Sequence, residues 1–450
     1  MNKHLYNSIF YTKNRLMKPQ LIRDIVIAWK NQYLPAEELR DIRVKKLSKL
    51  LHHAYENCPF YREKFDKAGF HPDNFRELKD IEKIPLLSKS EIRDNLDTIT
   101  ASNLPTSRRD VVNTGGTTGI PMKLYRDEAA KDLMTAMYLR TTKMYGCSVG
   151  SKTAWIWGLK KENEYLDFRN HDFKSQHIKN TSWYNGFDMN DKSMREFAAF
   201  SFKFKPELMI SYVSSLFEYA HFLKQNRIKF YPLTAIWLTA EPVEAIQRQL
   251  IEEVFQCPTY SQYGSSEILH IATECNAHKG LHIHADSRYV EILDAEGKSL
   301  GPDEPGYIVV TDLENFIMPF IRYKNDDISS FLMDECSCGS KFPKLNPVMG
   351  RVYNVFKLKS GKQIYGHMFS RKLFDLVDEI QCFQVHQTAH ESITISIVPG
   401  IIEDRGKFIS ELTGYFTYYT GNEVEYTFRF VDDIPREKSG KLMYTKSDIK

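Results

Sequence analysis

The sequence has 450 residues, of which 42% are hydrophobic and 26% charged, and its 61 Lys and Arg nearly balance 58 Asp and Glu. At ~150 residues per domain this length predicts two to four domains. The composition excludes collagen-like, disulfide-rich and wholly disordered chains. A net charge of +3 is too small for a nucleic-acid binder that relies on bulk charge, so no nucleic-acid partner is expected. No run approaches the ~18 apolar residues of a membrane span, and the first residues lack the apolar core of a secretory signal. We therefore expect a cytoplasmic protein without a transmembrane segment.

The first fifty residues are the basic exception to this balance. They hold 11 Lys and Arg against 4 Asp and Glu, interleaved with Leu, Ile, Trp and Tyr. The pattern predicts a solvated helical face. The alternative is a basic surface that associates peripherally with an anionic membrane or with a partner.

The first part of the chain is expected to be helical, up to about residue 105. Apolar residues at helical spacing predict a helix over Ala36–Lys67 that is broken before Pro59. From about Arg109 the pattern is α/β, with a helix that begins at Asp127 as its N-cap. Predicted strands are Asp110–Asn113, Met122–Tyr125, Lys152–Trp157, Ala235–Thr239, Arg288–Leu293 and Tyr307–Thr311. Alternating strands and helices favour a mainly parallel sheet.

The pattern of predicted strands and helices changes again after Gly350. Strands are predicted at Val352–Leu358, Ile393–Val398 and Val424–Val431, with helices near Ser370–Glu379 and Asp404–Tyr419. These elements are enough for a small α+β domain of ~100 residues. We therefore divide the chain into a large domain over residues 1–349, whose helical segment spans 1–105, and a small domain over residues 350–450.

Five segments carry chemistry. The strongest is Asn113-Thr114-Gly115-Gly116-Thr117-Thr118-Gly119-Ile120-Pro121, in which glycines let the backbone approach an anion and hydroxyls donate to phosphate oxygens. It lacks the G-x-x-x-x-G-K-[ST] ending of a P-loop. The others are Thr239-Ala240-Glu241-Pro242, Tyr263-Gly264-Ser265-Ser266-Glu267, Ile321-Arg322-Tyr323-Lys324-Asn325-Asp326-Asp327 and Pro435-Arg436-Glu437-Lys438-Ser439-Gly440-Lys441.

In this order and spacing the five segments resemble the adenylate-forming superfamily. Two further segments, Asn57-Cys58-Pro59-Phe60-Tyr61-Arg62-Glu63 and Ile84-Pro85-Leu86-Leu87-Ser88-Lys89, resemble its phenylacetate–CoA ligase and CapK-type branch, the latter associated with capsular polysaccharide genes. The resemblance covers about residues 40–450. It implies an α/β fold of the adenylate-forming type, with a large N-terminal domain and a small mobile C-terminal domain. It also implies an AMP-forming ligase that uses ATP to activate a carboxylic acid as an acyl-adenylate, with release of pyrophosphate.

The resemblance assigns the ATP site residue by residue. Glu241 and Tyr263 would bracket the adenine, Asp327 would bind both ribose hydroxyls, and Arg351 would lie near the same ribose. The phosphate loop would consist of Thr114, Gly115, Gly116, Thr117, Thr118 and Gly119.

Three more residues would serve the reaction itself. Ser266 would meet the α-phosphate or the substrate carboxylate, Glu267 would ligate Mg²⁺, and Lys441 would be the catalytic lysine of the small domain. These residue types suit the chemistry, because a carboxylate attacking a phosphate brings two anions together and needs opposite charge nearby. The structural alternatives are a core role for Tyr263 and helix-capping roles for Glu267 and Asp327.

Some positions depart from the family pattern. Lys324 stands where an arginine is common, Asp326 where a glycine is usual, and Tyr353 and Asn354 where an acidic pair follows Gly350-Arg351 in relatives. That last region is a hinge in relatives, so the acceptor of the acyl group stays open. CoA thioester formation is one reading, and CapK-type transfer to an amine or hydroxyl of a sugar is the other. A catalytically degenerate, nucleotide-binding member is a third.

The seven cysteines predict no disulfide framework in a reducing compartment. Four of them are expected to be buried thiols: Cys58, Cys147, Cys257 and Cys382. The other three, Cys275, Cys336 and Cys338, could form a tetrahedral structural Zn²⁺ site with His282, for which His278 and His284 are rival ligands. Some bacterial relatives of the branch carry such a zinc. The alternative is a pair of core thiols that bind no metal.

Aromatic residues are candidates for the acyl pocket. They are Tyr212, Trp237 and the Trp155–Trp157 run, and their alternative role is that of plain core.

Overall fold

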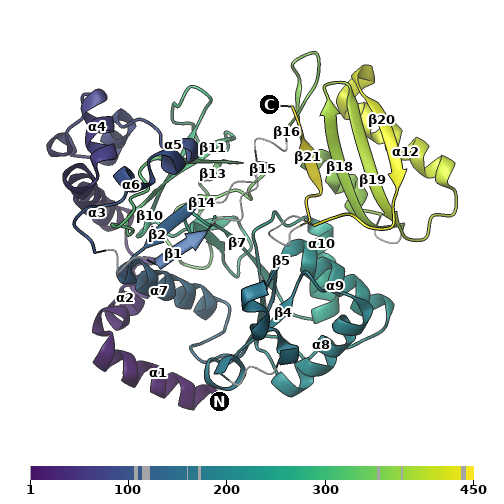
Figure 1. Cartoon of the computed structure of the whole chain (residues 1–450), viewed down its shortest axis with the longest axis horizontal. Helices are drawn as coiled ribbons and strands as arrows, with labels where there is room; N and C mark the ends of the chain where they lie inside the picture. Colours follow the sequence, from purple (N-terminus) through teal and green to yellow (C-terminus); the bar gives the residue numbers. More distant parts are fainter. Residues whose placement is uncertain are drawn as a thin grey trace. The chain divides into compact units, whose positions relative to one another are not determined.

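The computed structural model describes residues 2–105, 110–113, 122–159, 161–170, 174–351, 355–376, 379–436 and 442–449. The chain divides into two compact units (Figure 1). Unit 1 comprises Met1–Ser151 and Tyr260–Val348, and unit 2 comprises Lys152–Thr259 and Met349–Lys450.

The N-terminal part of unit 1 is helical, as predicted. The long helix breaks between Asn57 and Pro59, because proline lacks a backbone N–H and disfavours helical geometry in the residue before it. Asp127 is the N-cap of α7 and accepts a hydrogen bond from the Ala130 backbone N–H at 2.8 Å. The helices are α1 (Lys3–Met17), α2 (Pro19–Asn31), α3 (Ala36–Asn57), α4 (Pro59–Lys67), η1 (Pro72–Asn74), η2 (Leu78–Lys83), α5 (Lys89–Asp94), α6 (Leu96–Ile99) and α7 (Glu128–Met144).

The strands of unit 1 pair antiparallel. They are β1 (Asp110–Asn113), β2 (Lys123–Arg126), β7 (Thr259–Tyr263), β8 (Ala272–Glu274), β9 (Leu281–Ile283), β10 (Arg288–Leu293), β11 (Gly306–Asp312), β12 (Tyr323–Ser329), β13 (Phe331–Leu332) and β14 (Lys344–Leu345). β1 pairs with β2, β10 with β11 and β11 with β12, and β13, β14, β9, β8 and β7 follow one another in a further sheet. The expectation of a mainly parallel sheet is wrong for this unit. Short connections such as 275–280 join only antiparallel neighbours, since a parallel crossover needs a dozen or more residues.

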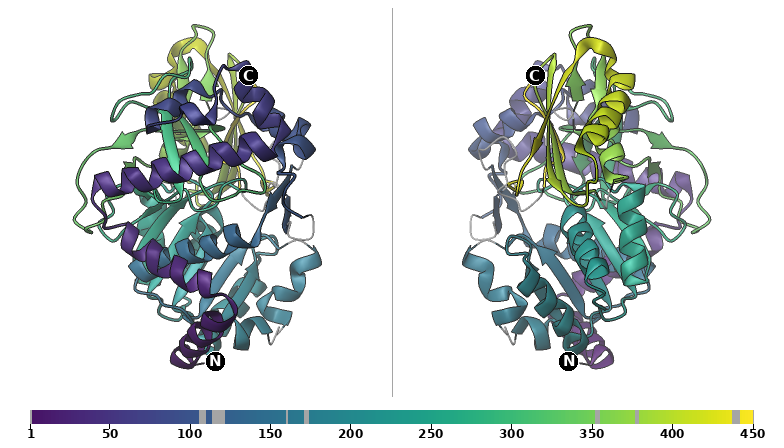
Figure 2. Two further views of the ribbon diagram at one scale, coloured as in Figure 1. Left: turned by 90° about the vertical axis from the view of Figure 1, so that its left-hand side faces the viewer. Right: turned by 90° about the vertical axis from the view of Figure 1, so that its right-hand side faces the viewer.

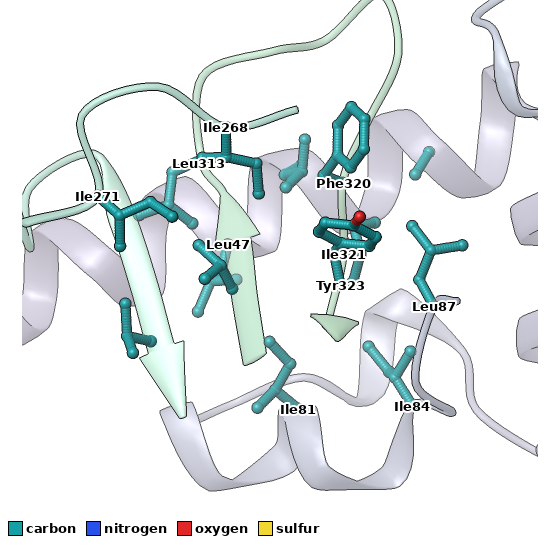
Figure 3. Close-up of a cluster of buried hydrophobic side chains, with 14 of the residues drawn as sticks. Leu47, Ile81, Ile84, Leu87, Ile268, Ile271, Leu313, Phe320, Ile321 and Tyr323 are labelled. Atoms are coloured by element: carbon teal, nitrogen blue, oxygen red, sulfur yellow. The ribbon is translucent and has the colours of Figure 1, made fainter. Parts of the chain in front are cut away.

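The hydrophobic core of unit 1 joins the N-terminal helices to these strands. Leu47 of α3 and Ile81 of η2 pack in one cluster with Ile268, Leu313 and Ile321, all of them buried (Figure 3). Residues far apart in the sequence therefore stabilise one another, and the helical N-terminal segment is part of the body that holds β7 and β12.

Unit 2 contains the parallel strands. β3 (Thr153–Trp157) pairs with β4 (Thr181–Asn185) and with β5 (Leu208–Tyr212), and β5 pairs with β6 (Ala235–Thr239), all in parallel. Helices α8 (Asp191–Phe204), α9 (Val213–Gln225) and α10 (Ala245–Phe255) follow β4, β5 and β6 in turn. Here the predicted alternation of strands and helices is confirmed. Between β3 and β4 lie η4 (Lys161–Leu166), η5 (Phe168–Asn170) and η6 (Lys174–Ile178).

The C-terminal part of unit 2 is an α+β fold, as predicted. Its sheet has the order β20–β19–β18–β21, and α12 lies along it (Figure 2). Its core continues into the parallel part of the unit, where the rings of Phe217 and Phe374 meet edge to face at 5.9 Å. The elements are β15 (Gly350–Arg351), β16 (Val355–Lys357), β17 (Gln363–Tyr365), α11 (His367–Phe374), β18 (Ile380–Ala389), β19 (Ser392–Pro399), α12 (Arg405–Thr420), η8 (Gly421–Glu423), β20 (Glu425–Phe430) and β21 (Thr445–Ser447).

Among the helices of the described residues, none combines the length and the apolar character that crossing a membrane requires.

Candidate nucleotide site and metal centre

Tyr263 and Asp327 meet in unit 1, as the assignment of both to one nucleotide requires. Tyr263 ends β7 and Asp327 lies on β12, and both side chains are buried. The Tyr263 hydroxyl donates to Asp327 Oδ2 at 2.9 Å, and the side-chain amide of Asn325 donates to the same hydroxyl. The Asp327 backbone N–H donates to Asn325 Oδ1 at 3.2 Å. The ring proposed for adenine and the carboxylate proposed for ribose are thus held together.

A tight turn after β7 presents Ser266 and Glu267. A Cβ on Gly264 would lie 2.8 Å from Gln262 Nε2 and 3.0 Å from the His270 backbone nitrogen, so a larger residue would crowd the turn. The turn leaves Ser266 exposed and Glu267 buried. Serine and carboxylate therefore follow directly on the Tyr263–Asp327 pair in one rigid segment.

Arg126 connects this turn to the hairpin that carries the phosphate loop. Asn113 at the end of β1 pairs with Lys123 of β2, and the guanidinium of Arg126 in β2 donates to the Ser266 carbonyl. Thr114, Gly115, Gly116, Thr117, Thr118 and Gly119 lie outside the described residues. The strands on either side of them are positioned against the Ser266–Glu267 turn.

Lys89 is a further candidate site residue, to which the family resemblance assigns no role. Its Nζ lies 3.7 Å from Glu267 Oε1. Leu87 forms a parallel bridge with Tyr323, in which the Leu87 N–H donates to the Arg322 carbonyl at 2.9 Å and the Lys324 N–H donates to the Leu87 carbonyl at 3.0 Å. This bridge brings a lysine from the N-terminal segment to the proposed Mg²⁺ ligand. Its only signal in the sequence was membership of the Ile84–Lys89 segment.

The departures from the family pattern on β12 have structural explanations. Asp326, at the usual glycine position, has φ +64°, so the left-handed backbone geometry is retained with an aspartate. Such a residue costs about 1 kcal/mol, which the surrounding strand must offset. Lys324, at the common arginine position, lies 3.6 Å from the centre of the Tyr307 ring.

Glu241 lies in unit 2, where its carboxylate caps α9. Its Oε2 accepts a hydrogen bond from the Ser214 backbone N–H at 2.6 Å, and its Oε1 accepts one from the Ser214 hydroxyl at 2.9 Å. Its side chain therefore has a structural role in addition to any contact with adenine. Arg351 is described only as a backbone position of β15.

Lys441 lies outside the described residues, and described residues before and after it make contacts within unit 2. Arg436, five residues earlier, forms an ion pair with Glu218 of α9. Leu442, which follows Lys441 directly, is buried, and the Val385 N–H donates to the Tyr444 carbonyl at 2.8 Å. Tyr353 and Asn354 also lie outside the described residues.

The four predicted zinc ligands converge. The ligand atoms of Cys275, His282, Cys336 and Cys338 all lie within 4.8 Å of one another. Cys275 Sγ is 3.4 Å from Cys336 Sγ, and Cys338 Sγ is 3.3 Å from His282 Nε2. Two sulfur ligands of a tetrahedral zinc ion lie ~3.8 Å apart, so small shifts would complete such a site.

The surroundings of the cluster fit a zinc ion. His282 Nδ1 donates to the Phe342 carbonyl at 3.1 Å, which leaves Nε2 available as a ligand. Burial lowers the pKa of His282, which favours the neutral imidazole that a metal binds. Lys344 lies opposite His282 in the β14–β9 pair, and its buried Nζ has no hydrogen-bond partner among the described residues. Three thiolates, an imidazole and Zn²⁺ carry a net charge of −1, which this ammonium group would offset.

The rival ligands serve other contacts. His278 Nδ1 lies 3.1 Å from Glu274 Oε1, and its ring stacks on Tyr260. His284 is buried, and its Nδ1 accepts from the guanidinium of Arg140. The geometry therefore favours His282 over both.

An aromatic row crosses the parallel sheet of unit 2. Trp155 stacks on Trp183 at 4.7 Å, and Trp157 lies 4.1 Å from Tyr212. The strand registers put Trp237 on the same face as Trp155. None of these five belongs to the hydrophobic cluster that the opposite face forms with α8 and α9, although Tyr212 and Trp237 are themselves buried.

Known proteins are similar in sequence to most of this chain. The model of the CapK C-terminal domain matches residues 357–448. A phenylacetate–coenzyme A ligase of Thermus thermophilus is 26% identical over 378 residues, which is 78% of this chain and 79% of the relative. The protein CapK of Staphylococcus aureus is 22% identical over 421 residues, which is 92% of this chain and 90% of the relative.

The fold has relatives among solved structures. The crystal structure of a 2-hydroxyisobutyryl-CoA ligase in the postadenylation state superimposes with a TM-score of 0.78 at 18% identity, covering 93% of this chain and 92% of that one. The chain therefore has the α/β fold of adenylate-forming ligases, and its sequence is similar to AMP-forming ligases. Within that class it is a relative of the phenylacetate–coenzyme A ligases and of CapK, which confirms the resemblance seen in the sequence.

Proposed function

We propose that this protein activates a carboxylic acid with ATP and passes the acyl group to coenzyme A. In the first step a carboxylate oxygen attacks the α-phosphorus of ATP, the bond to the β-phosphate oxygen breaks, and pyrophosphate leaves. In the second step the sulfur of coenzyme A attacks the acyl carbon, AMP leaves, and a thioester forms. The observation that carries the proposal is the joint position of Tyr263, Asp327, Ser266 and Glu267 in one rigid part of unit 1.

The nucleotide is bound through its adenine, its ribose and its phosphates. Tyr263 stacks on the adenine, and Asp327 accepts hydrogen bonds from the ribose hydroxyls, with Arg351 near the same ribose. The loop Thr114–Gly119 donates to the β- and γ-phosphates, and its supporting strand β2 is fixed to the turn through Arg126. The resemblance also assigns Glu241 to the adenine, and within unit 2 its carboxylate caps α9.

Charge complementarity lowers the barrier to attack. Two anions must approach, so a positioned cation stabilises the transition state by several kcal/mol. Lys441 bridges the attacking carboxylate and the α-phosphate, Ser266 donates to one of them, and Lys89 faces the phosphates beside Glu267. Glu267, a buried carboxylate, is the kind of oxygen ligand that Mg²⁺ takes together with phosphate oxygens. When bound, Mg²⁺ neutralises phosphate charge.

The acid is a flat, apolar one. The face of the unit 2 sheet that bears Trp155, Trp157 and Tyr212 is opposite the α8 and α9 cluster, and the carboxyl ends of parallel strands are where α/β folds bind ligands. Aromatic rings at that edge favour an aryl or arylalkyl carboxylate over a short aliphatic one.

A second acceptor has its own support. Residues 357–448 match the CapK C-terminal domain, and a CapK relative extends over 92% of this chain. CapK-type transfer would send the acyl group to an amine or hydroxyl of a sugar, with AMP again leaving. A structural zinc ion at Cys275, His282, Cys336 and Cys338 is compatible with either acceptor. Its role would be to join the loop between β13 and β14 to β8 and β9.

Two assays test the proposal. Acid-dependent exchange of pyrophosphate into ATP across a panel of carboxylates tests activation, and the absence of exchange with every acid would favour a degenerate nucleotide-binding member. The best acid is then supplied with coenzyme A in one tube and with amino sugars or a nucleotide sugar in another. Rapid thioester formation with no amide or ester would eliminate the sugar acceptor, and the reverse result would eliminate coenzyme A.

A further inference from the structure

The outward side of the first two helices is an unusual surface for this protein. Of the fifteen large hydrophobic side chains that are exposed among the described residues, seven lie between residues 5 and 33. The same stretch, counted from residue 2, holds six Lys and Arg and a single acidic residue, Asp24. Apolar and basic side chains are therefore concentrated together in a short part of the chain that contains none of the proposed site residues.

Helix α1 shows the pattern most clearly. Leu5, Ile9 and Leu16 are 54%, 46% and 81% exposed, and their spacing of four and seven residues puts them within about 40° of one another around the helix axis. Lys13 and Arg15 are exposed and project to either side of this stripe. An apolar stripe with basic flanks is the arrangement of a helix that lies in a membrane interface.

Helix α2 repeats the composition on its outer side. Val26 and Ile27 are 48% and 50% exposed, and Arg23 and Lys30 are exposed within the same sector of the helix. Asp24 is half-buried and accepts a hydrogen bond from Gln20 at 2.8 Å. The outward side of α2 therefore also offers methyl groups and positive charge together.

Helix α2 is fixed to unit 1, and Tyr6 of α1 lies against Gly150 of the same unit, so this surface has a defined orientation. Asn31 of α2 donates to buried Asp286 at 3.1 Å, and Arg140 of α7 donates to the Ala28 carbonyl at 2.9 Å. Lys18, between the two helices, pairs with Asp132 of α7 at 2.8 Å. Figure 2 shows the two helices as the first purple segments of the chain. The inner side of α2 is engaged, whereas α1 buries none of its residues, and the outer sides of both helices are open.

We infer that the outer sides of α1 and α2 form a docking surface for an anionic phospholipid bilayer. Exposed apolar side chains insert among the headgroups, while lysines and arginines attract the lipid phosphates. The excess of positive charge selects this partner over a second copy of the chain, because a symmetric interface would bring the same basic residues of two copies together. This inference is independent of the proposed reaction.

Sedimentation of the full chain with vesicles tests the surface. We expect binding to vesicles of phosphatidylcholine with phosphatidylglycerol, little binding to phosphatidylcholine alone, and release as salt shortens the Debye length from ~10 Å at 0.1 M to ~3 Å at 1 M. Two variants should each weaken binding by at least about tenfold. One replaces three apolar residues, Leu5→Ser, Ile9→Ser and Leu16→Ser, and the other reverses four charges, Lys13→Glu, Arg15→Glu, Arg23→Glu and Lys30→Glu.

Matched controls keep the test decisive. Exposed residues elsewhere are changed in the same way, as Phe202→Ser, Ile401→Ser and Tyr418→Ser, or as Lys192→Glu, Lys203→Glu and Lys407→Glu. These should bind vesicles like the unaltered protein, and thermal unfolding checks that all variants are folded. Failure of the unaltered chain to bind anionic vesicles at low salt, or equal loss in the control sets, would overturn the inference. A dimer abolished by the apolar variant, without vesicle binding, would assign the surface to a second copy instead.

Discussion

Tyr263 and Asp327, 64 residues apart in the sequence, are joined by a hydrogen bond of 2.9 Å from the tyrosine hydroxyl to the aspartate Oδ2. The bond couples the end of β7 to the middle of β12. It gives the proposed adenine-stacking ring and the proposed ribose-binding carboxylate a fixed relation before any nucleotide arrives. Such preorganisation reduces the entropic cost of binding.

Removing the hydroxyl with Tyr263→Phe should therefore weaken ATP binding more than it slows chemistry. We expect the KM for ATP to rise about tenfold with a smaller change in kcat, and the free energy of unfolding to fall by about 1 kcal/mol. The measurements are exchange kinetics at varied ATP and urea unfolding. Tyr165→Phe, at an exposed ring, is the control. An unchanged KM for ATP would remove Tyr263 from the site.

The lysine beside Glu267 gives a second expectation. Lys89→Met keeps the length of the side chain and removes the charge that we place at the phosphates, so exchange should slow by about tenfold or more. Lys83→Met is the matched control, because Lys83 is an exposed lysine six residues earlier and pairs with Asp80. Equal activity of the two variants would show that Lys89 is only a structural partner of Glu267.

The cysteine cluster should bind one zinc ion per chain. Elemental analysis of protein purified without added metal measures it, and the double variant Cys336→Ser, Cys338→Ser should lose the metal together with thermal stability. Binding free energy of a structural site is also folding free energy, so the midpoint of thermal unfolding should fall by several degrees. Cys382→Ser, at a thiol outside the cluster, should retain both. Metal-free protein of full stability would contradict the site.

The ion pair between Glu218 and Arg436 should matter for one half-reaction. Glu218→Gln removes the charge that pairs with Arg436, five residues before Lys441, so we expect adenylate formation to slow by about tenfold. Conversion of supplied acyl-adenylate to thioester should change less, because Lys441 acts on the first step. Glu253→Gln, at an exposed pair with Lys224, is the control. Equal loss in both half-reactions would make the pair merely structural.

Local signals in the sequence predicted much of the structure. Proline at 59 ended a helix and Asp127 began one, because each effect depends on neighbouring residues only. Alternation of strands and helices predicted the parallel strands of unit 2. It was wrong for unit 1, where short segments such as β8 and β9 are too brief for a clear period and their tight connections impose antiparallel pairing.

The candidate site was also predicted only in part, because only some of its residues carry a signal in the sequence. Cys275, His282, Cys336 and Cys338 are distinctive residues, and the structure brings all four together. Lys89 carried no such signal, since its position depends on a bridge between Leu87 and Tyr323 that no local pattern encodes. The capping bond from Ser214 to Glu241 is equally non-local. Contacts between distant segments are decided by packing, which a single sequence does not display.

The central claim is that a carboxylate oxygen attacks the α-phosphorus of ATP, and isotope transfer tests it most directly. An acid labelled with oxygen-18 in its carboxylate is turned over with ATP and the acceptor, and the AMP released is analysed by mass spectrometry. We expect one labelled oxygen in AMP and none in pyrophosphate, and we expect Lys441→Ala to form labelled AMP at least about a hundredfold more slowly while still binding ATP. Unlabelled AMP, label in inorganic phosphate, or full activity of Lys441→Ala would contradict the account.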